Sequence, residues 1–348
     1  MKRLALALAL TLSAHTLPAE VLYSGDGGKT WTSAGLAGSS IGKIYPDPAD
    51  PKIAVALLID RRTLHRTADG GKTWKDISPG AAVLCVALDP SDPKSIWVGG
   101  ESGTFSRSKD AGATWTKGEI GAPAASKMTM QRTGADGKPV GPAQGVTKSV
   151  LAMAVLGKRI YAGGGAGNGF MAASDDDGKT WTAVEYQSGS PTITAMTIAK
   201  SAFLFAGTLG IAASTDSGKT FKGVAGVEGR MGGGGHFSRS GGGDRVAYSC
   251  RGQFVVSADG GKTWGAIPVP ERTFPSSAAW AGKKMIVVAE SGEVSGGLTG
   301  NFTPDPDYKV TLFETEDSKT WKASPPTPAV PTTIAGTCDG KGIWLGTR

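Results

Sequence analysis

Histidine and cysteine are both scarce in this sequence, with three of each in 348 residues. Only His65 and His236 lie beyond the N-terminal segment, which argues against a histidine-rich metal centre and a Ser–His–Asp triad. The glycine run at 232–235 lacks the G-x-x-x-x-G-K-[ST] spacing of a phosphate-binding loop. Asp175–Asp177 imitate the start of a calcium loop, but the glutamate of its twelfth position is missing. We therefore expect no metal and no cofactor.

Long apolar runs are missing outside the first residues of the chain, so we predict no transmembrane segment. Residues 1–19 begin with Lys2 and Arg3 and continue as LALALALTL, the pattern of a secretory signal peptide. Cleavage after Ala14 and cleavage after Ala19 both fit this pattern. We predict that the remaining protein is exported, to the periplasm or as a secreted protein.

The sequence carries only a small excess of positive charge. The formal net charge is +7, and removal of the two basic residues Lys2 and Arg3 leaves +5. A mildly basic protein can take an anionic partner without requiring one. We expect a monomer whose partner is a protein or an anionic ligand, with no nucleic-acid partner.

One eight-residue phrase, typified by SADGGKTW at 257–264, occurs seven times along the chain. Serine or threonine is followed two residues later by aspartate, then by glycine, threonine and an aromatic residue. The Asp and Ser side chains can bind backbone N–H groups of their own turn, and glycine accepts a positive φ. Each copy therefore predicts a hairpin turn that ends in an aromatic anchor, and we name these segments the repeated turns: 24–31, 67–74, 108–115, 174–181, 214–221, 257–264 and 314–321.

The seventh repeated turn departs from the others. Aligned on Trp321, it has Glu316 at the aspartate position and Ser318 at the glycine position, which predicts a looser turn. In the other six copies the aspartates are Asp26, Asp69, Asp110, Asp176, Asp216 and Asp259. The aromatic anchors of all seven are Trp31, Trp74, Trp115, Trp181, Phe221, Trp264 and Trp321.

The spacing of the anchors predicts the fold. Successive anchors lie 43, 41, 66, 40, 43 and 57 residues apart, and a period near 42 is typical of a four-stranded propeller blade. The chain after residue 19 starts with VLYSGDGGKTW, two outer strands, and ends with TTIAGTCDGKGIWLGTR, two inner strands. We therefore predict an all-β, seven-bladed β-propeller over residues 20–348, closed by terminal strands that share one blade.

The three cysteines are predicted on strands of non-neighbouring blades. Cys85 falls in the third blade, Cys250 in the sixth and Cys338 in the shared first blade. Because such blades do not touch, we expect three buried free thiols and no disulfide.

The repeated turns resemble the Asp-box (BNR) repeat, S-x-D-x-G-x-T-W, which implies a propeller whose repeats lie at the periphery. A single seven-bladed ring of this kind is similar to propellers of the photosystem II assembly-factor type, which implies a binding platform with an arginine-rich face. The sialidases of the wider family carry an Arg-Ile-Pro motif and six blades, and xyloglucan-type glycosidases carry two propellers; this chain has neither feature.

Two long insertions, 122–147 and 291–309, are predicted on the face opposite the repeated turns, because they join strands four to one and two to three. On the same rim, an arginine cluster could recognise carboxylates or phosphates through paired hydrogen bonds. The alternative is that the insertions are tolerated loops and each arginine pairs locally or is solvated. The candidate binding residues are Arg61, Arg62, Glu101, Arg230, Arg251, Arg272 and Glu290, with Phe302 and Tyr308 as apolar anchors.

We therefore favour a non-catalytic binding scaffold, and we keep a glycoside hydrolase as the alternative. A glycosidase needs two carboxyl groups about 5–10 Å apart. Asp60 and Glu101, on adjacent blades, are the better pair, since Glu101 and Glu290 are expected across the ring from each other. Tyr248 is the tyrosine that we place near the rim arginines, but no glutamate adjoins it.

Overall fold

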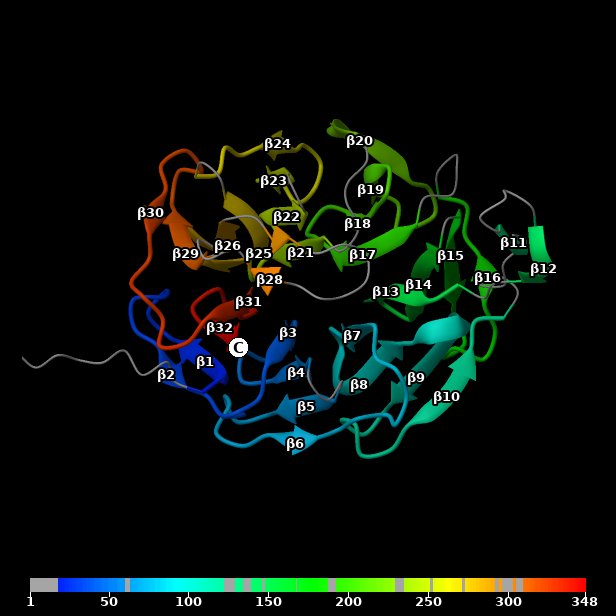
Figure 1. Cartoon of the computed structure of the whole chain (residues 1–348), viewed down its shortest axis with the longest axis horizontal. Helices are drawn as coiled ribbons and strands as arrows, with labels where there is room; N and C mark the ends of the chain where they lie inside the picture. The colour runs from blue at the N-terminus through cyan, green and yellow to red at the C-terminus, as the bar shows by residue number, and fades with distance from the viewer. Residues whose placement is uncertain are drawn as a thin grey trace, which may run out of the picture.

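The computed structural model is a ring of four-stranded sheets around a central axis (Figure 1). It describes residues 18–59, 63–121, 129–133, 139–145, 148–166, 168–186, 192–228, 235–250, 253–270, 273–291, 294–295, 303–304 and 309–348. Seven such sheets confirm the predicted all-β, seven-bladed propeller.

Blade 1 is built from both ends of the chain. Its strands, from the axis outward, are β31 (Pro331–Gly336), β32 (Ile343–Thr347), β1 (Val21–Ser24) and β2 (Thr32–Ser33). Strand β1 pairs antiparallel with β32, from Val21 opposite Gly346 to Ser24 opposite Ile343. The Thr347 hydroxyl adds a second link, because it accepts the N–H of Glu20 at 2.8 Å and donates to the Glu20 carbonyl at 2.9 Å. The predicted closure by the two termini is confirmed.

The other blades follow one another in chain order, each from the axis outward. Blade 2 is β3 (Ile41–Pro46), β4 (Ala54–Leu58), β5 (Leu64–Thr67) and β6 (Lys75–Asp76). Blade 3 is β7 (Cys85–Asp89), β8 (Asp92–Gly99), β9 (Thr104–Ser108) and β10 (Thr116–Glu119), with the short 3₁₀ helix η1 (Glu101–Gly103) between β8 and β9. Blade 4 is β13 (Val150–Leu156), β14 (Arg159–Ala166), β15 (Asn168–Ser174) and β16 (Thr182–Ala183).

Blade 5 is β17 (Ile193–Ile198), β18 (Phe203–Gly207), β19 (Gly210–Ser214) and β20 (Lys222–Glu228). Blade 6 is β21 (His236–Arg239), β22 (Val246–Cys250), β23 (Gln253–Ser257) and β24 (Gly265–Ala266). Blade 7 is β25 (Thr273–Ala281), β26 (Lys284–Ser291), β29 (Lys309–Thr315) and β30 (Lys322–Ala323). Two separate hairpins, β11 (Thr129–Thr133) with β12 (Pro139–Gly145) and β27 (Val294–Ser295) with β28 (Thr303–Pro304), interrupt this order.

The hydrophobic core lies between the blades. Its clusters each join side chains of two neighbouring blades, as where Trp344 of blade 1 packs with Ile41 and Leu58 of blade 2. The second strands are buried on both faces and read as continuous apolar runs, such as FLFAG in β18. The fourth strands β2, β6 and β16 have two exposed residues each, which limits pairing at the outer edge of these blades.

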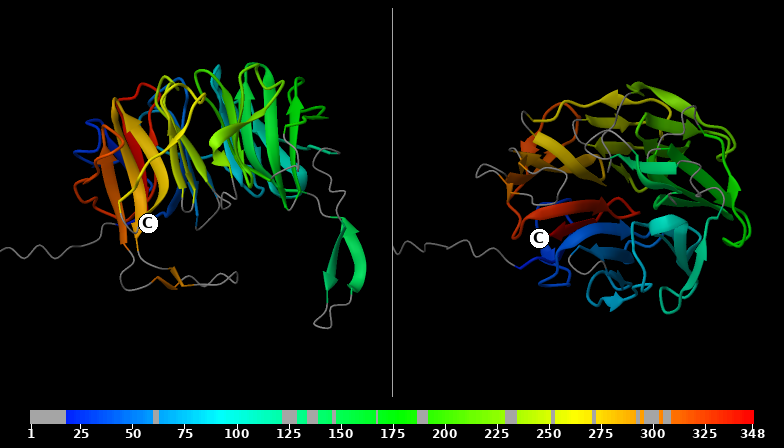
Figure 2. Two further views of the ribbon diagram at one scale, coloured as in Figure 1. Left: turned by 90° about the horizontal axis from the view of Figure 1, so that it is seen from above. Right: turned by 45° about the vertical axis from the view of Figure 1, so that its right-hand side comes forward.

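Antiparallel pairing within each blade gives the ring two distinct faces. The connections between strands one and two and between strands three and four lie on one face, which we name the turn face because it carries the repeated turns. The connections from strand two to three and from strand four to the next blade lie on the other, which we name the loop face. In the left view of Figure 2 the hairpin β11–β12, strands β27 and β28, and the C-terminus lie on the same side of the ring.

Each repeated turn is closed by its aspartate. In the second copy, Asp69 accepts the Thr67 hydroxyl at 2.8 Å, the Thr73 N–H at 3.0 Å and the Thr73 hydroxyl at 2.6 Å. Thr67 in turn accepts the Gly71 N–H at 2.9 Å. These hydrogen bonds, chiefly those from Thr73, lower the pKa of Asp69 to about 2, because they favour the charged carboxylate.

The seventh repeated turn is tighter than predicted, and the aligned aspartate was misassigned. Asp317, not Glu316, accepts the Thr315 hydroxyl and the N–H groups of Lys319 and Thr320. The six other copies use two consecutive residues with positive φ, as at Gly70 and Gly71, whereas this copy uses one, Ser318 at φ 60°. One left-handed residue has been deleted, and the hydrogen-bonding pattern is kept over a shorter segment.

Three aromatic anchors also link neighbouring blades by hydrogen bonds. The indole N–H of Trp74 donates to the Ala34 carbonyl at 2.6 Å, and that of Trp115 to the Ile77 carbonyl at 2.9 Å. Trp321 makes the equivalent bond to Pro268 at 2.6 Å. In each case the acceptor lies just after the fourth strand of the preceding blade, so the anchor fixes both the turn and the inter-blade contact.

Cys85 and Cys338 are free thiols, as predicted. Cys85 is buried in blade 3, but Cys338 is only half-buried and lies in the turn after β31, so its predicted strand position and burial were wrong. The side chain of Cys250 lies outside the described residues, although its backbone belongs to β22. In the part of the chain that the structure describes, no helix has the length and apolar character needed to cross a membrane.

Candidate functional site

Exposed apolar side chains gather on the loop face. Among the described residues, the large hydrophobic side chains with high exposure are Ile59 at 56%, Phe274 at 47%, Leu209 at 42% and Val330 at 38%. Ile59 and Leu209 follow the second strands of blades 2 and 5, while Phe274 and Val330 stand at the start of the first strands of blades 7 and 1. All four positions belong to the loop face, and we name them the apolar rim.

Three members of the apolar rim come from consecutive blades. Blade 7 contacts blade 1, and blade 1 contacts blade 2, through their inner strands. The backbone of Ile59 is fixed by its N–H, which donates to the Ser40 carbonyl at 2.9 Å just before β3. Phe274, Val330 and Ile59 therefore lie on one continuous sector of the ring. Singly exposed apolar residues are ordinary on protein surfaces; these four share the loop face.

Most of the predicted binding residues lie outside the described residues. They are Arg61, Arg62, Arg230, Arg251, Arg272, Phe302 and Tyr308, and Asp60 of the alternative carboxyl pair lies outside them as well. Their chain positions nevertheless adjoin the apolar rim: Arg61 and Arg62 follow Ile59, and Arg272 precedes Phe274 by two residues. The apolar rim itself was missed, because Ile59 looks like a continuation of the buried run AVALL.

Glu101 and Glu290 are described, and they stand on separate blades. Glu101 is exposed in η1 of blade 3, next to Ser102, which has a positive φ of 52°. Glu290 is half-buried in β26 of blade 7, opposite Phe274 in the β25–β26 pair. The structure records no contact between the two carboxyl groups.

Tyr248 is not a rim residue. Its side chain has no exposed surface and packs in the core between blades 5 and 6, where its ring contacts Phe237 with centroids 4.8 Å apart. The position that we predicted for Tyr248, near the rim arginines, was therefore wrong. It belongs to β22, a second strand whose residues Val246–Ser249 are all buried.

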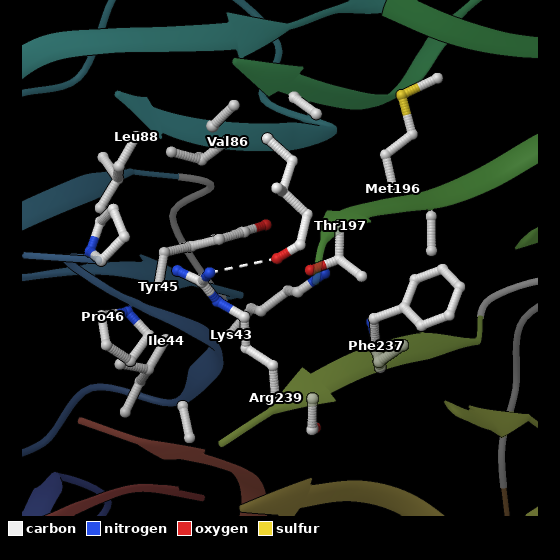
Figure 3. Close-up of a pocket in the computed structure, with 18 of the residues that line it drawn as sticks. Lys43, Ile44, Tyr45, Pro46, Val86, Leu88, Met196, Thr197, Phe237 and Arg239 are labelled. Carbon is white, nitrogen blue, oxygen red and sulfur yellow. Dashed lines mark hydrogen bonds between the residues drawn. The ribbon is translucent and has the colours of Figure 1, made fainter. Parts of the chain in front are cut away.

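A cavity of about 260 Å³ occupies the centre of the ring and is lined by the first strands of all seven blades. Figure 3 shows the side chains of Lys43 and Arg239 extending into this space, with Tyr45 and Thr197 beside them. Apolar side chains, including Val86, Leu88, Met196 and Phe237, form part of the wall. No group of three or more metal-ligating side chains occurs among the described residues.

Basic groups dominate the charge of the central cavity. Lys43 lies over the ring of Tyr45, with its Nζ 5.1 Å from the ring centroid. Burial lowers the pKa of Lys43 to about 8, and the nearby Lys43 charge, followed by burial, lowers the pKa of His236 to about 3. Burial also lowers the pKa of Arg239, whose guanidinium donates to the Ile198 carbonyl at 3.2 Å. The cavity thus contains two basic side chains, Lys43 and Arg239, the imidazole of His236 and, at its wall, the carboxyl group of Asp47.

Asp47 is the acid among the described residues that line the cavity, and it is engaged in its own turn. One oxygen accepts the N–H groups of Ala49 at 2.8 Å and Asp50 at 2.9 Å. The ion pairs of the described residues lie elsewhere, at Arg107–Asp177, Lys109–Asp177, Arg159–Asp175 and Lys284–Glu314. Sequence reasoning missed these cavity residues, because only the strand register shows which side chains of β3 and β21 face the axis.

No protein-family model matches the sequence, and no curated protein matches it either. Solved structures do resemble its fold. One titled "YCF48 bound to D1 peptide" superposes with a TM-score of 0.57 at 13% identity, covering 95% of this chain and 99% of that one. YCF48 from Cyanidioschyzon merolae gives 0.56 at 13% identity, covering 94% and 98%. An ancestral GH74 enzyme gives 0.53 at 15% identity, covering 95% of this chain and 45% of that one. At such low identity these likenesses show the fold alone: a seven-bladed propeller similar both to YCF48 and to part of a GH74 enzyme.

Proposed function

We propose that this protein is an exported, non-catalytic propeller that binds a partner through its loop face, and that the partner is a protein segment with both apolar and acidic side chains. The apolar rim is the observation that carries the proposal. Buried apolar contacts supply most of the affinity of a protein interface, and four exposed large apolar residues on one face provide such contacts.

The charge requirement comes from the residues that flank the apolar rim in sequence. Arg61 and Arg62 lie two and three residues after Ile59, and Arg272 lies two residues before Phe274. Arginine pairs with carboxylates through two parallel hydrogen bonds, so a partner that places acidic groups beside its apolar side chains suits this surface best. Arg230 and Arg251 would extend the same pattern to blade 6, and the two insertions would wall the surface.

The likeness to a propeller bound to a peptide supports a binding role, as does the similarity of the repeated turns to Asp boxes. In this proposal the repeated turns are structural, since their polar groups are satisfied within each turn. Residues 1–19 would direct export and be removed.

Selection from a library of short random peptides tests the proposal. We expect enrichment of peptides that combine aromatic or aliphatic residues with Asp or Glu. The double variant Ile59→Ser/Phe274→Ser should weaken binding of a selected peptide at least tenfold, since losing about 1.4 kcal/mol of apolar contact is sufficient. The matched control, Lys72→Ser/Lys319→Ser, changes exposed residues on the turn face of the same two blades and should leave the affinity unchanged. No enrichment, or an equal loss in both variants, would contradict the proposal.

The alternative function is glycoside hydrolysis, which the likeness to a GH74 enzyme favours at the level of fold. Its candidate carboxyl pair is Asp60 and Glu101. Release of reducing sugar from β-glucans by the wild type, and its loss in Glu101→Gln, would establish this alternative in place of the scaffold.

A further inference from the structure

We propose that the central cavity is a second binding site, separate from the apolar rim, and that it takes a small carboxylate with an apolar tail. The carboxylate would lie between the Lys43 ammonium and the Arg239 guanidinium. The apolar tail would contact the wall formed by side chains such as Val86, Leu88 and Met196.

The first argument is uncompensated charge. Placing a cation inside a protein is costly unless an anion or hydrogen bonds offset the loss of water. Lys43 and Arg239 both extend into the cavity, and neither forms an ion pair with a carboxylate among the described residues. A bound anion would supply the missing charge, whereas a neutral or cationic ligand would not.

The second argument is the supply of hydrogen-bond donors. The ammonium of Lys43 has three N–H donors, and its recorded contact is with the face of the Tyr45 ring. Arg239 has five N–H donors, of which one is bound to the Ile198 carbonyl. The remaining donors of the planar guanidinium match the two oxygens of a carboxylate.

The third argument is size and polarity. A cavity of about 260 Å³ is slightly smaller than the usual small-molecule site of about 300–1,000 Å³, so it suits a ligand of only a few heavy atoms. The mixture of two cations with aliphatic and thioether side chains fits an aliphatic carboxylate better than it fits phosphate, which has no apolar part. Both proposed cationic residues, Lys43 and Arg239, stand on first strands, and the turns that follow these strands complete the wall.

Other titratable groups lie around Lys43 in the cavity. They are Tyr45 on its own strand, Cys85 on β7, His236 and Arg239 on β21, and Asp47 and Cys338 at the cavity wall. Burial raises the pKa of Cys85 to about 12, and the pKa of His236 is lowered to about 3. Neither group changes its charge near neutral pH, and Lys43 does so at about 8.

Calorimetric titration of the full-length protein with sodium butyrate, in a low-chloride buffer at pH 7, tests the proposal. We expect one saturable site for butyrate, no binding of butanamide and weaker binding of inorganic phosphate. Lys43→Met and Arg239→Met should each weaken butyrate binding at least tenfold, while the matched control Lys75→Met, on the exposed strand β6, should not. Because Lys43→Met removes a half-buried cation that has no ion-pair partner among the described residues, we expect it to fold and to melt no lower than the wild type.

No saturable butyrate binding, equal binding by Lys43→Met, or equal binding of butanamide would overturn the site. Phosphate binding more tightly than butyrate would overturn the carboxylate assignment. The test is independent of the apolar rim: Ile59→Ser/Phe274→Ser should bind butyrate like the wild type, so either proposal can fail alone.

Discussion

The inter-blade hydrogen bond of Trp115 allows a sharp test of how the repeated turns stabilise the ring. Trp115→Phe removes the indole N–H but keeps an aromatic ring in the contact between blades 2 and 3. The acceptor, the carbonyl of Ile77, belongs to a residue with only 2% exposure, and the bond measures 2.9 Å. Losing a hydrogen bond of this kind and leaving its acceptor unpaired costs about 1–2 kcal/mol.

Trp181 provides the matched control. It occupies the equivalent position in the fourth repeated turn and is also half-buried, with its ring 5.4 Å from that of Phe105, but its indole nitrogen makes no hydrogen bond within the described residues. Trp181→Phe loses similar ring area and also removes an indole N–H that is buried without a partner among the described residues, so the difference between the two variants combines loss of the Trp115 hydrogen bond with relief of that unpaired donor. We expect urea unfolding to show a free energy of unfolding about 1–2 kcal/mol lower for Trp115→Phe than for Trp181→Phe, with equal m-values. A difference below about 0.5 kcal/mol would refute a stabilising role for this bond.

Three further outcomes follow from local geometry. Ser318→Gly should raise the free energy of unfolding by about 0.5–1 kcal/mol, because glycine relieves the positive φ of 60°; a lower melting temperature would contradict this. Asp69 has a folded-state pKa lowered to about 2, so its stabilising contribution is full above the ordinary value of 3.8 and is lost as the pH falls below it. Asp69→Asn should therefore flatten the acid-unfolding profile between pH 3.8 and about pH 2, as followed by circular dichroism. An unchanged profile would count against the role of Asp69 in the turn. Butyrate affinity should fall as the pH rises above about 8, because Lys43 loses its proton there. Lys43→Met should abolish this pH dependence. If Lys43→Met shows the same fall in affinity, the pH dependence belongs to another group.

The fold was predictable because the repeated turns recur at a nearly constant interval and because the two chain ends complement each other. The pairing of β1 with β32 confirms the second inference directly. The seventh turn was misread, since alignment on Trp321 assumed a constant turn length, whereas the chain deletes one left-handed residue and uses Asp317. Tyr248 was misplaced because a strand-end tyrosine in sequence cannot be assigned to the rim or the core without the packing of blade 5 against blade 6.

The candidate sites were harder to predict than the fold. The arginines that sequence reasoning selected remain a prediction, whereas the apolar rim depends on exposure, which a run such as AVALLI does not reveal. The cavity cations depend on register: Lys43 faces the axis because of the pairing of β3 with β4, which includes an irregularity between Ile41 and Lys43. Exposure and register both arise from tertiary packing, which the sequence pattern leaves undetermined.

The claim that the loop face is a binding platform is tested most directly by quantitative capture from an extract of the native host. The baits are the wild type, Ile59→Ser/Phe274→Ser and the turn-face control Lys72→Ser/Lys319→Ser, with equal melting temperatures verified first. Our account predicts a partner protein that is retained by the wild type and the control and lost by the loop-face variant. A partner retained equally by all three baits, or lost only by the turn-face variant, would contradict it.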